Sequence, residues 1–147
     1  RHDLKQERKY TEGNPQIRSR RQEKRRALLE QGVTLEMAQA NVVVINPTHV
    51  AVALKYEDSG MEAPKVVAKG RAKIAERIRQ LARQHNIPII QEPPVARALY
   101  ETTALGESVP PVLYQAVAEI LATVYRAAQK RQQERMERIR RRQQRGG

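Results

Sequence analysis

Cysteine is absent from this sequence of 147 residues, and histidine occurs only three times. Without thiols the chain can form neither disulfide bonds nor thiolate metal sites, a composition that fits a reducing compartment. His2, His49 and His85 have no spacing that would gather metal ligands. The glycines of the centre are isolated and form no phosphate-cradling loop, and Asp58-Ser59 has no nucleophile-elbow setting. We therefore expect no metal and no cofactor.

Long hydrophobic runs and the larger aromatic residues are absent too. No run approaches the ~18 apolar residues of a membrane-spanning helix and no signal-peptide pattern is present, so we expect no membrane span within this chain. The aromatic residues are five tyrosines, with no phenylalanine or tryptophan. None is interleaved with basic residues in the manner used for stacking on bases. The sequence therefore gives little support to nucleic-acid binding.

Acidic residues are scarce relative to basic ones, at 16 against 28, which gives a net charge of +12. Residues 1–30 hold 10 basic and 5 acidic side chains, residues 126–147 hold 9 and 2, and residues 31–125 hold 9 of each. The neutral centre is long enough for one compact domain with its own core. We divide the chain into a basic linker or helix at 1–38, a folded domain at 39–127, and a basic tail, helical or disordered, at 128–147.

The centre alternates between strand patterns and helix patterns. Apolar β-branched runs predict strands at 42–45, 50–56, 66–68 and 87–90, and amphipathic spacing predicts helices at 71–85, 95–103 and 113–124. Gly70 is expected to end the third strand, and Pro88 indicates an edge or strand-start position for the fourth. Pro93-Pro94 would break that fourth strand. This order predicts an α/β fold, a small four-stranded sheet surrounded by helices, with an extended basic N-terminal helix or linker and a basic C-terminal helical tail.

The tetrapeptide Asn46-Pro47-Thr48-His49 lies between two apolar runs and is chemically unusual. Asparagines commonly deamidate when the next residue's backbone nitrogen attacks the side-chain amide, but Pro47 has no N–H and closes that route. The reverse attack stays open. In it the Asn46 side-chain nitrogen adds to its own backbone carbonyl, closes a succinimide and expels Pro47 as a new amino terminus. We therefore predict that the chain cuts itself between Asn46 and Pro47.

Cyclisation of Asn46 needs a reactive backbone geometry, a base, and donors for the developing oxyanion. Pro47 suits the second position of a tight turn, with Asn46 at the first. His49 would lie across that turn, where a neutral imidazole takes or relays a proton near neutral pH. Thr48 would supply its hydroxyl or its backbone N–H. We assign Asn46 as nucleophile, Pro47 as leaving group, and Thr48 and His49 as assisting residues.

Two other interpretations stay open from the residues alone. An Asn-Pro pair is also common in ordinary turns. In that interpretation His49 is the first residue of a strand, and the chain is a static scaffold whose Asn-Pro bond never breaks. Alternatively, the chain is a basic module that binds nucleic acid or an anionic membrane, with an uncleaved Asn-Pro turn. Self-cleavage requires Asn46, binding requires the basic ends, and the scaffold requires neither.

Five blocks of the chain, in order, resemble the cytoplasmic domain of the flagellar export-apparatus switch protein FlhB and its injectisome counterparts of the YscU/SctU type. They are EGNP at 12–15, VVVINPTHVAVALKY at 42–56, APKVVAKG at 63–70, IPIIQEPPVARALY at 87–100 and VPPVLYQAVAEILATVY at 109–125. The third block and the residues at 113–124 are closer to the flagellar branch. The resemblance ends near Ala128.

The resemblance implies a switch domain of a type III protein export apparatus, flagellar or injectisome. Its self-cleavage between Asn46 and Pro47 would be the single-turnover reaction of an asparagine peptide lyase rather than that of a turnover enzyme. The two pieces would stay associated, because the strands on either side of the cut remain paired. Rearrangement of the cut loop would then change the surface offered to substrates and switch export from an early to a late class.

The resemblance also implies transmembrane helices before Arg1 and a position at the cytoplasmic face of the bacterial inner membrane. The basic first arm would lie near anionic lipid headgroups, with a hinge at 12–15 because Gly13 and Pro15 disfavour a continuous helix. The expected partners are other membrane components of the export gate, the export substrates, and a hook-length or needle-length ruler protein. Nucleic acid is not expected among them.

Overall fold

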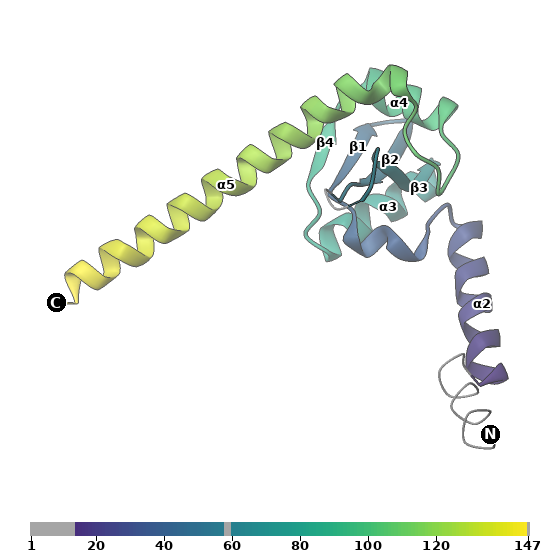
Figure 1. Cartoon of the computed structure of the whole chain (residues 1–147), viewed down its shortest axis with the longest axis horizontal. Coiled ribbons are helices and arrows are strands. Elements are labelled where there is room, and N and C mark those ends of the chain that lie inside the picture. Colours follow the sequence, from purple (N-terminus) through teal and green to yellow (C-terminus); the bar gives the residue numbers. More distant parts are fainter. Residues whose placement is uncertain (1–13, 58–59, 147) are drawn as a thin grey trace.

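Two helices project from a body that is built around one sheet (Figure 1). The computed structural model describes residues 14–57 and 60–146. Within them, the body holds a four-stranded sheet, and α2 (Pro15–Glu30) and α5 (Tyr114–Arg145) extend away from it. The predicted α/β class, with a four-stranded sheet surrounded by helices, is confirmed.

The sheet places its two most apolar strands inside. Its members are β1 (Val42–Asn46), β2 (Val50–Lys55), β3 (Lys65–Arg71) and β4 (Ile89–Gln91), in the spatial order β3-β2-β1-β4. β1 pairs antiparallel with β2 and parallel with β4, and β2 pairs antiparallel with β3. An inner strand covered on both faces has no solvent side, which explains the continuous apolar run of β1.

Helices cover both faces of the sheet. The remaining elements of the body are η1 (Leu35–Gln39), α3 (Lys73–Gln84), α4 (Pro93–Thr102) and η2 (Pro111–Leu113). Val43 packs on the face covered by η1 and α3, while Val42 and Val44 pack on the face covered by α4 and the first half of α5. β1 is therefore packed against helices on both of its faces, up to the loop that follows it.

Two local predictions are corrected by the structure. β3 does not end at Gly70 but continues to Arg71. A glycine is required there because a Cβ would overlap the side chain of Ile74, in the first turn of the covering helix. Pro93 and Pro94 open α4 instead of lying before it, since proline at the first helical positions removes no intrahelical hydrogen bond. β4 lies at the sheet edge and begins directly after Pro88, in agreement with the predicted edge or strand-start position.

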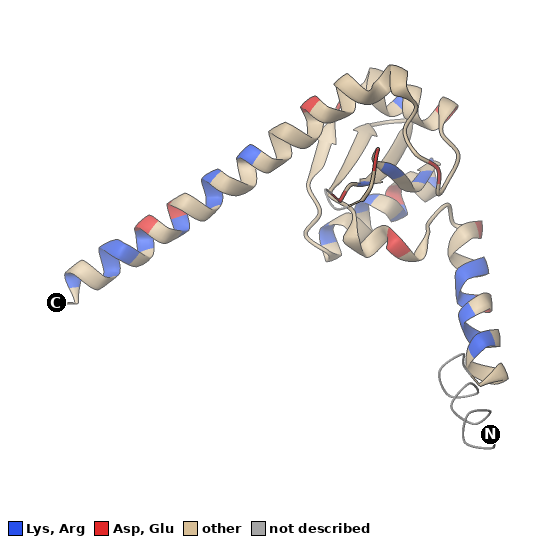
Figure 2. Cartoon of the chain, in the orientation of Figure 1, with Lys and Arg blue, Asp and Glu red and all other residues tan. Residues whose placement is uncertain are grey.

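Both basic ends are helical where the structure describes them. α2 begins at Pro15 with Asn14 as its N-cap, and the Asn14 side chain accepts the Gln16 N–H at 3.1 Å. The first half of the predicted hinge at 12–15 lies outside the described residues. α5 continues without a break to Arg145. Lysine and arginine positions, coloured blue, are concentrated on α2 and on the outer half of α5 (Figure 2).

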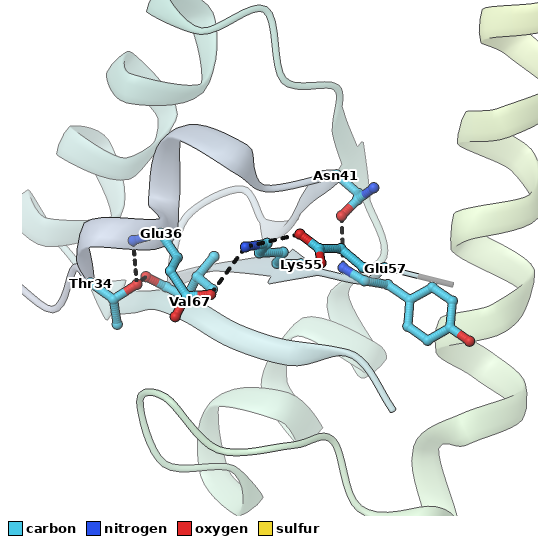
Figure 3. Close-up of polar contacts among 7 residues, drawn as sticks. Thr34, Glu36, Asn41, Lys55, Glu57 and Val67 are labelled. Carbon is cyan, nitrogen blue, oxygen red and sulfur yellow. Dashed lines mark hydrogen bonds and ion pairs between the residues drawn. The ribbon is translucent and has the colours of Figure 1, made fainter. Parts of the chain in front are cut away.

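The segment before β1 belongs to the packed body. Val33 and Met37 are 2% and 3% exposed, although they lie within the residues assigned to the linker. The hydroxyl of Thr34 donates to the Val67 carbonyl at 2.9 Å (Figure 3). The segment is thus attached to β3 as well as to the core.

A second group of contacts fixes the same segment to the end of β2. The Asn41 side-chain oxygen accepts the Tyr56 N–H at 2.7 Å. The Lys55 ammonium lies 3.2 Å from a carboxylate oxygen of Glu57 and 3.2 Å from one of Glu36 (Figure 3). These two carboxylates raise the pKa of Lys55 above its ordinary value. The chain entering β1 is therefore held on the strand that leaves the Asn-Pro loop.

Candidate functional site

The predicted tetrapeptide forms the connection between β1 and β2. Asn46 is the last residue of β1 and pairs with Val50, the first residue of β2. The backbone N–H of His49 donates to the Asn46 carbonyl oxygen at 2.9 Å. This hydrogen bond from the fourth residue to the first confirms the predicted tight turn, with Pro47 at its second position.

Asn46 is buried, whereas the rest of the loop is exposed. Asn46 has 8% of its surface accessible, while Pro47, Thr48 and His49 lie in solvent. Across residues 14–57 and 60–146, no hydrogen bond to the Asn46 side-chain amide is formed. The amide therefore has no protein partner to release before it turns toward its own backbone carbonyl.

The Asn46 carbonyl, which cyclisation would attack, already has a hydrogen-bond donor. The His49 N–H that closes the turn at 2.9 Å points at the oxygen on which negative charge would develop. The sequence assigned such a donor to Thr48. In the structure the donor on this oxygen is the backbone of His49. The turn hydrogen bond is therefore also a candidate oxyanion contact.

The residue after Asn46 is held by α3. Arg79 Nη1 donates to the Pro47 carbonyl oxygen at 3.0 Å. This contact ties Pro47 to a helix that is packed on the sheet. No sequence pattern marked the contact, because Arg79 is one of several arginines on the polar face of the predicted helix.

A solvent-open depression of about 360 Å³ adjoins the loop. Its lining comes from the loop, the β3–α3 junction and α4, and comprises Asn46, Thr48, His49, Val50, Arg71, Ala72, Arg97, Tyr100 and Glu101. The depression gives water access to the otherwise buried asparagine, and His49 lines it together with Asn46. Asn46 and His49 therefore border the same solvent-open space.

Ala72, at the β3–α3 junction of this depression, has an unusual backbone conformation. Its φ is 55° and its ψ is −124°, in a region that non-glycine residues rarely adopt. Such a residue costs about 1–3 kcal/mol and persists only where the surrounding structure enforces it. No glycine or asparagine marked the position in the sequence, so the feature could not be predicted.

The site has the groups of an internal cyclisation and lacks those of a metal centre. Within the part of the chain that the structure describes, no three His, Asp or Glu side chains gather in a way that could hold a metal ion. The reacting groups would be the amide, the carbonyl and the peptide nitrogen of consecutive residues.

The strands and the loop that build this site lie in a segment with known relatives. Residues 1–124 match the model of the FlhB HrpN YscU SpaS family. The chain belongs to this family. The flagellar biosynthetic protein FlhB of Yersinia enterocolitica is 44% identical over 123 residues, covering 84% of this chain and 32% of that protein. FlhB of Aquifex aeolicus is 44% identical over 124 residues, covering 84% of this chain and 35% of that protein.

Solved structures of the FlhB HrpN YscU SpaS family share the fold. The cytoplasmic domain of FlhB from Shewanella putrefaciens superposes with a TM-score of 0.63 at 44% identity, covering 66% of this chain and 74% of that one. A mutated EscU C-terminal domain gives a TM-score of 0.58 at 29% identity, covering 60% and 89%. In that EscU variant an asparagine is replaced by alanine, and in another solved EscU variant the next residue, a proline, is replaced by alanine.

The chain spans about a third of the length of the curated FlhB relatives it matches. Among the helices that the structure describes, none combines the length and the apolar character needed to cross a membrane. The family match ends at residue 124, whereas α5 continues to Arg145.

Proposed function

We propose that this chain is the switch domain of a flagellar-type or injectisome-type export apparatus, and that it cleaves itself between Asn46 and Pro47. One observation carries the proposal. Asn46 ends a buried strand, and its side-chain amide forms no hydrogen bond with the residues that the structure describes. Its backbone carbonyl oxygen lies 2.9 Å from the backbone nitrogen of His49. This arrangement supplies a nucleophile, an electrophile and an oxyanion donor within one turn.

The proposed reaction balances within the loop. The Asn46 side-chain nitrogen attacks the Asn46 carbonyl carbon and loses one proton, which His49 or an adjacent water relays. The carbonyl oxygen takes negative charge while it accepts the His49 N–H at 2.9 Å. The bond from that carbon to the Pro47 nitrogen then breaks, and the nitrogen takes up one proton and leaves as a secondary amine. Water later opens the succinimide at residue 46.

Replacement of Pro47 by alanine should slow scission about two- to fivefold through the loss of fixed backbone geometry alone. An alanine also supplies the backbone N–H whose absence closed the deamidation route, so part of the variant should deamidate at Asn46 without breaking. A mass-spectrometric time course separates the two products. Pro64→Ala, in a different loop, is the matched control. An unchanged rate in Pro47→Ala would mean that the strands alone set the geometry.

The proposed role in export follows from the freedom of movement that the cut gives to the Asn-Pro loop. Scission removes the covalent link across an exposed loop, while the two strands stay in the sheet. The freed ends of the loop would change the surface offered to export substrates or to a hook-length or needle-length ruler protein, and so switch export from early to late substrates. The likeness to a domain described as cytoplasmic supports a position at the cytoplasmic face of the inner membrane, beside other gate components.

The export role is tested in the bacterium that makes the protein. With Asn46→Ala in the chromosomal gene, early substrates should still appear in the culture medium, whereas late substrates should fall at least about tenfold, because the loop stays joined. Immunoblots of the culture medium measure the exported amounts of early and of late substrates. Normal export of late substrates by an uncut Asn46→Ala protein would separate cleavage from switching and refute the proposed role.

Binding of nucleic acid or of an anionic membrane through the basic ends is the alternative function. It is favoured by the exposure of all of α2 except partly buried Leu28, together with the concentration of lysine and arginine there and on outer α5. Such binding would not depend on Asn46 and would weaken steeply with salt.

A further inference from the structure

The outer half of α5 has no tertiary packing of its own. Every residue from 125 to 146 is exposed, and the buried residues of α5 are Val117 and Ile120. Figure 1 shows this half projecting away from the body. Helices outside a fold are marginal in water unless another surface covers them. The projecting half therefore offers a surface that the domain itself does not use.

An uncharged stripe runs along α5. Its members alternate four and three residues apart and are Ala118, Ala122, Tyr125, Gln129, Gln132, Met136, Ile139 and Gln143. This is the spacing of the a and d positions of a coiled coil, and every charged residue after Ala118 lies off the stripe. Three of its larger side chains are open to solvent, with Tyr125 64%, Met136 56% and Ile139 42% exposed. We name the part from Tyr125 to Gln143 the α5 seam.

Positive charge borders the seam on both sides. The flanking e and g positions from residue 126 onward are Arg126, Ala128, Gln133, Arg135, Arg140 and Arg142, with no acidic residue among them. Arginines also stand one turn apart along the helix, as at Arg138 and Arg142. Such like-charge pairs repel each other and weaken the isolated helix. A partner that brings acidic side chains to the flanks would remove this repulsion.

Charge distinguishes among the occupants of such a surface. A second copy of α5 would place arginine against arginine across the seam. An anionic bilayer would satisfy the charges, but the seam offers three glutamines and only two large aliphatic residues, a poor face for insertion into lipid. We propose that the α5 seam binds an acidic amphipathic helix of a partner protein, side by side, with acidic residues at the partner's e and g positions.

Binding at the seam is separate from self-cleavage. The seam lies wholly within residues 47–147, far along the chain from the Asn-Pro loop, so cutting should leave it unchanged. The glutamines and the short apolar stretch predict a modest affinity, and the arginine flanks predict a strong decrease of that affinity with salt.

A labelled helical peptide tests the proposal against the full chain of 147 residues. The probe carries leucine and isoleucine at a and d and glutamate at e and g, and its control carries lysine at e and g. Fluorescence anisotropy is measured for three proteins: the unaltered chain, a seam variant with Met136→Lys and Ile139→Lys, and an off-seam variant with Ala127→Lys and Gln144→Lys, two exposed positions outside the seam and its flanks. Both variants add the same charge, and thermal melting should match because no buried residue changes.

The seam variant should bind the acidic probe at least about tenfold more weakly than the off-seam variant, and the lysine probe should bind none of the three. Equal affinity of the two variants, or no binding of the acidic probe to the unaltered chain, would overturn the proposal. Vesicles containing phosphatidylglycerol provide the comparison with membrane. Binding to vesicles that the seam variant alone loses, without binding of the peptide, would make lipid the occupant and refute the acidic helix.

Discussion

Replacement of Asn46 by alanine is expected to leave the chain in one piece where the unaltered chain separates into residues 1–46 and 47–147. The substitution removes the nitrogen that attacks the adjacent carbonyl, and the exposed loop offers no equivalent nucleophile on that carbon. Loss of a nucleophile of this kind should slow scission by at least about a thousandfold. Denaturing gel electrophoresis after timed incubation at neutral pH measures the fraction cut.

The fold of the Asn46→Ala variant should be preserved. The hydrogen bond that closes the turn runs from the His49 N–H to the backbone oxygen of residue 46, which alanine retains. Asn41→Ala is the matched control, because Asn41 lies just before the same strand and makes a hydrogen bond outside the loop. The control should be cut at the normal rate. Scission that persists in Asn46→Ala would rule out cyclisation of this side chain.

The two pieces of the cut chain are expected to remain one particle under native conditions. Residues 1–46 contribute β1, an inner strand that pairs with β2 on one side and β4 on the other, both from the second piece. They also contribute the buried side chains of Val33, Met37, Val42, Val43 and Val44. At about 1.5–3 kcal/mol for each side chain, separation would expose on the order of 10 kcal/mol of hydrophobic burial.

Size-exclusion chromatography followed by a denaturing gel tests this association. The cut protein and uncut Asn46→Ala should elute at the same volume, and the cut sample should show two bands from that single peak. In denaturant the two pieces should elute separately. Their unfolding should also depend on protein concentration, unlike that of the uncut variant, because only the cut protein dissociates when it unfolds. Separation of the pieces in native buffer would contradict the role of β1 in holding them together.

Much of the fold was accessible from local patterns. The apolar run at 42–45 predicted the buried strand, and the Asn-Pro pair predicted the turn, because proline restricts the backbone just where the strand must stop. The course of α3 followed from the spacing of Ile74, Ile78 and Leu81. Each of these features depends on residues close together in the chain, and such patterns carry their own signal.

Features that depend on distant residues were not predictable. Gly70 was predicted to end a strand, but its lack of a side chain makes room for Ile74 within the packed body. Arg79 reaches the Pro47 carbonyl only because α3 crosses the sheet beside the loop. Ala72 adopts a positive φ at the one-residue junction between β3 and α3, two packed elements. In each case tertiary packing decided the role of a residue whose type gave no indication of it.

Self-cleavage breaks the bond between Asn46 and Pro47, and the intact mass of the purified, denatured protein shows most directly whether that bond is broken. We predict two masses for the unaltered chain, one beginning at Pro47 and one ending at residue 46 as a succinimide or as its hydrolysis product, heavier by one water. Asn46→Ala should give a single uncut mass. One intact mass for both proteins, after long incubation at neutral and mildly alkaline pH, would show that the loop is inert and contradict self-cleavage.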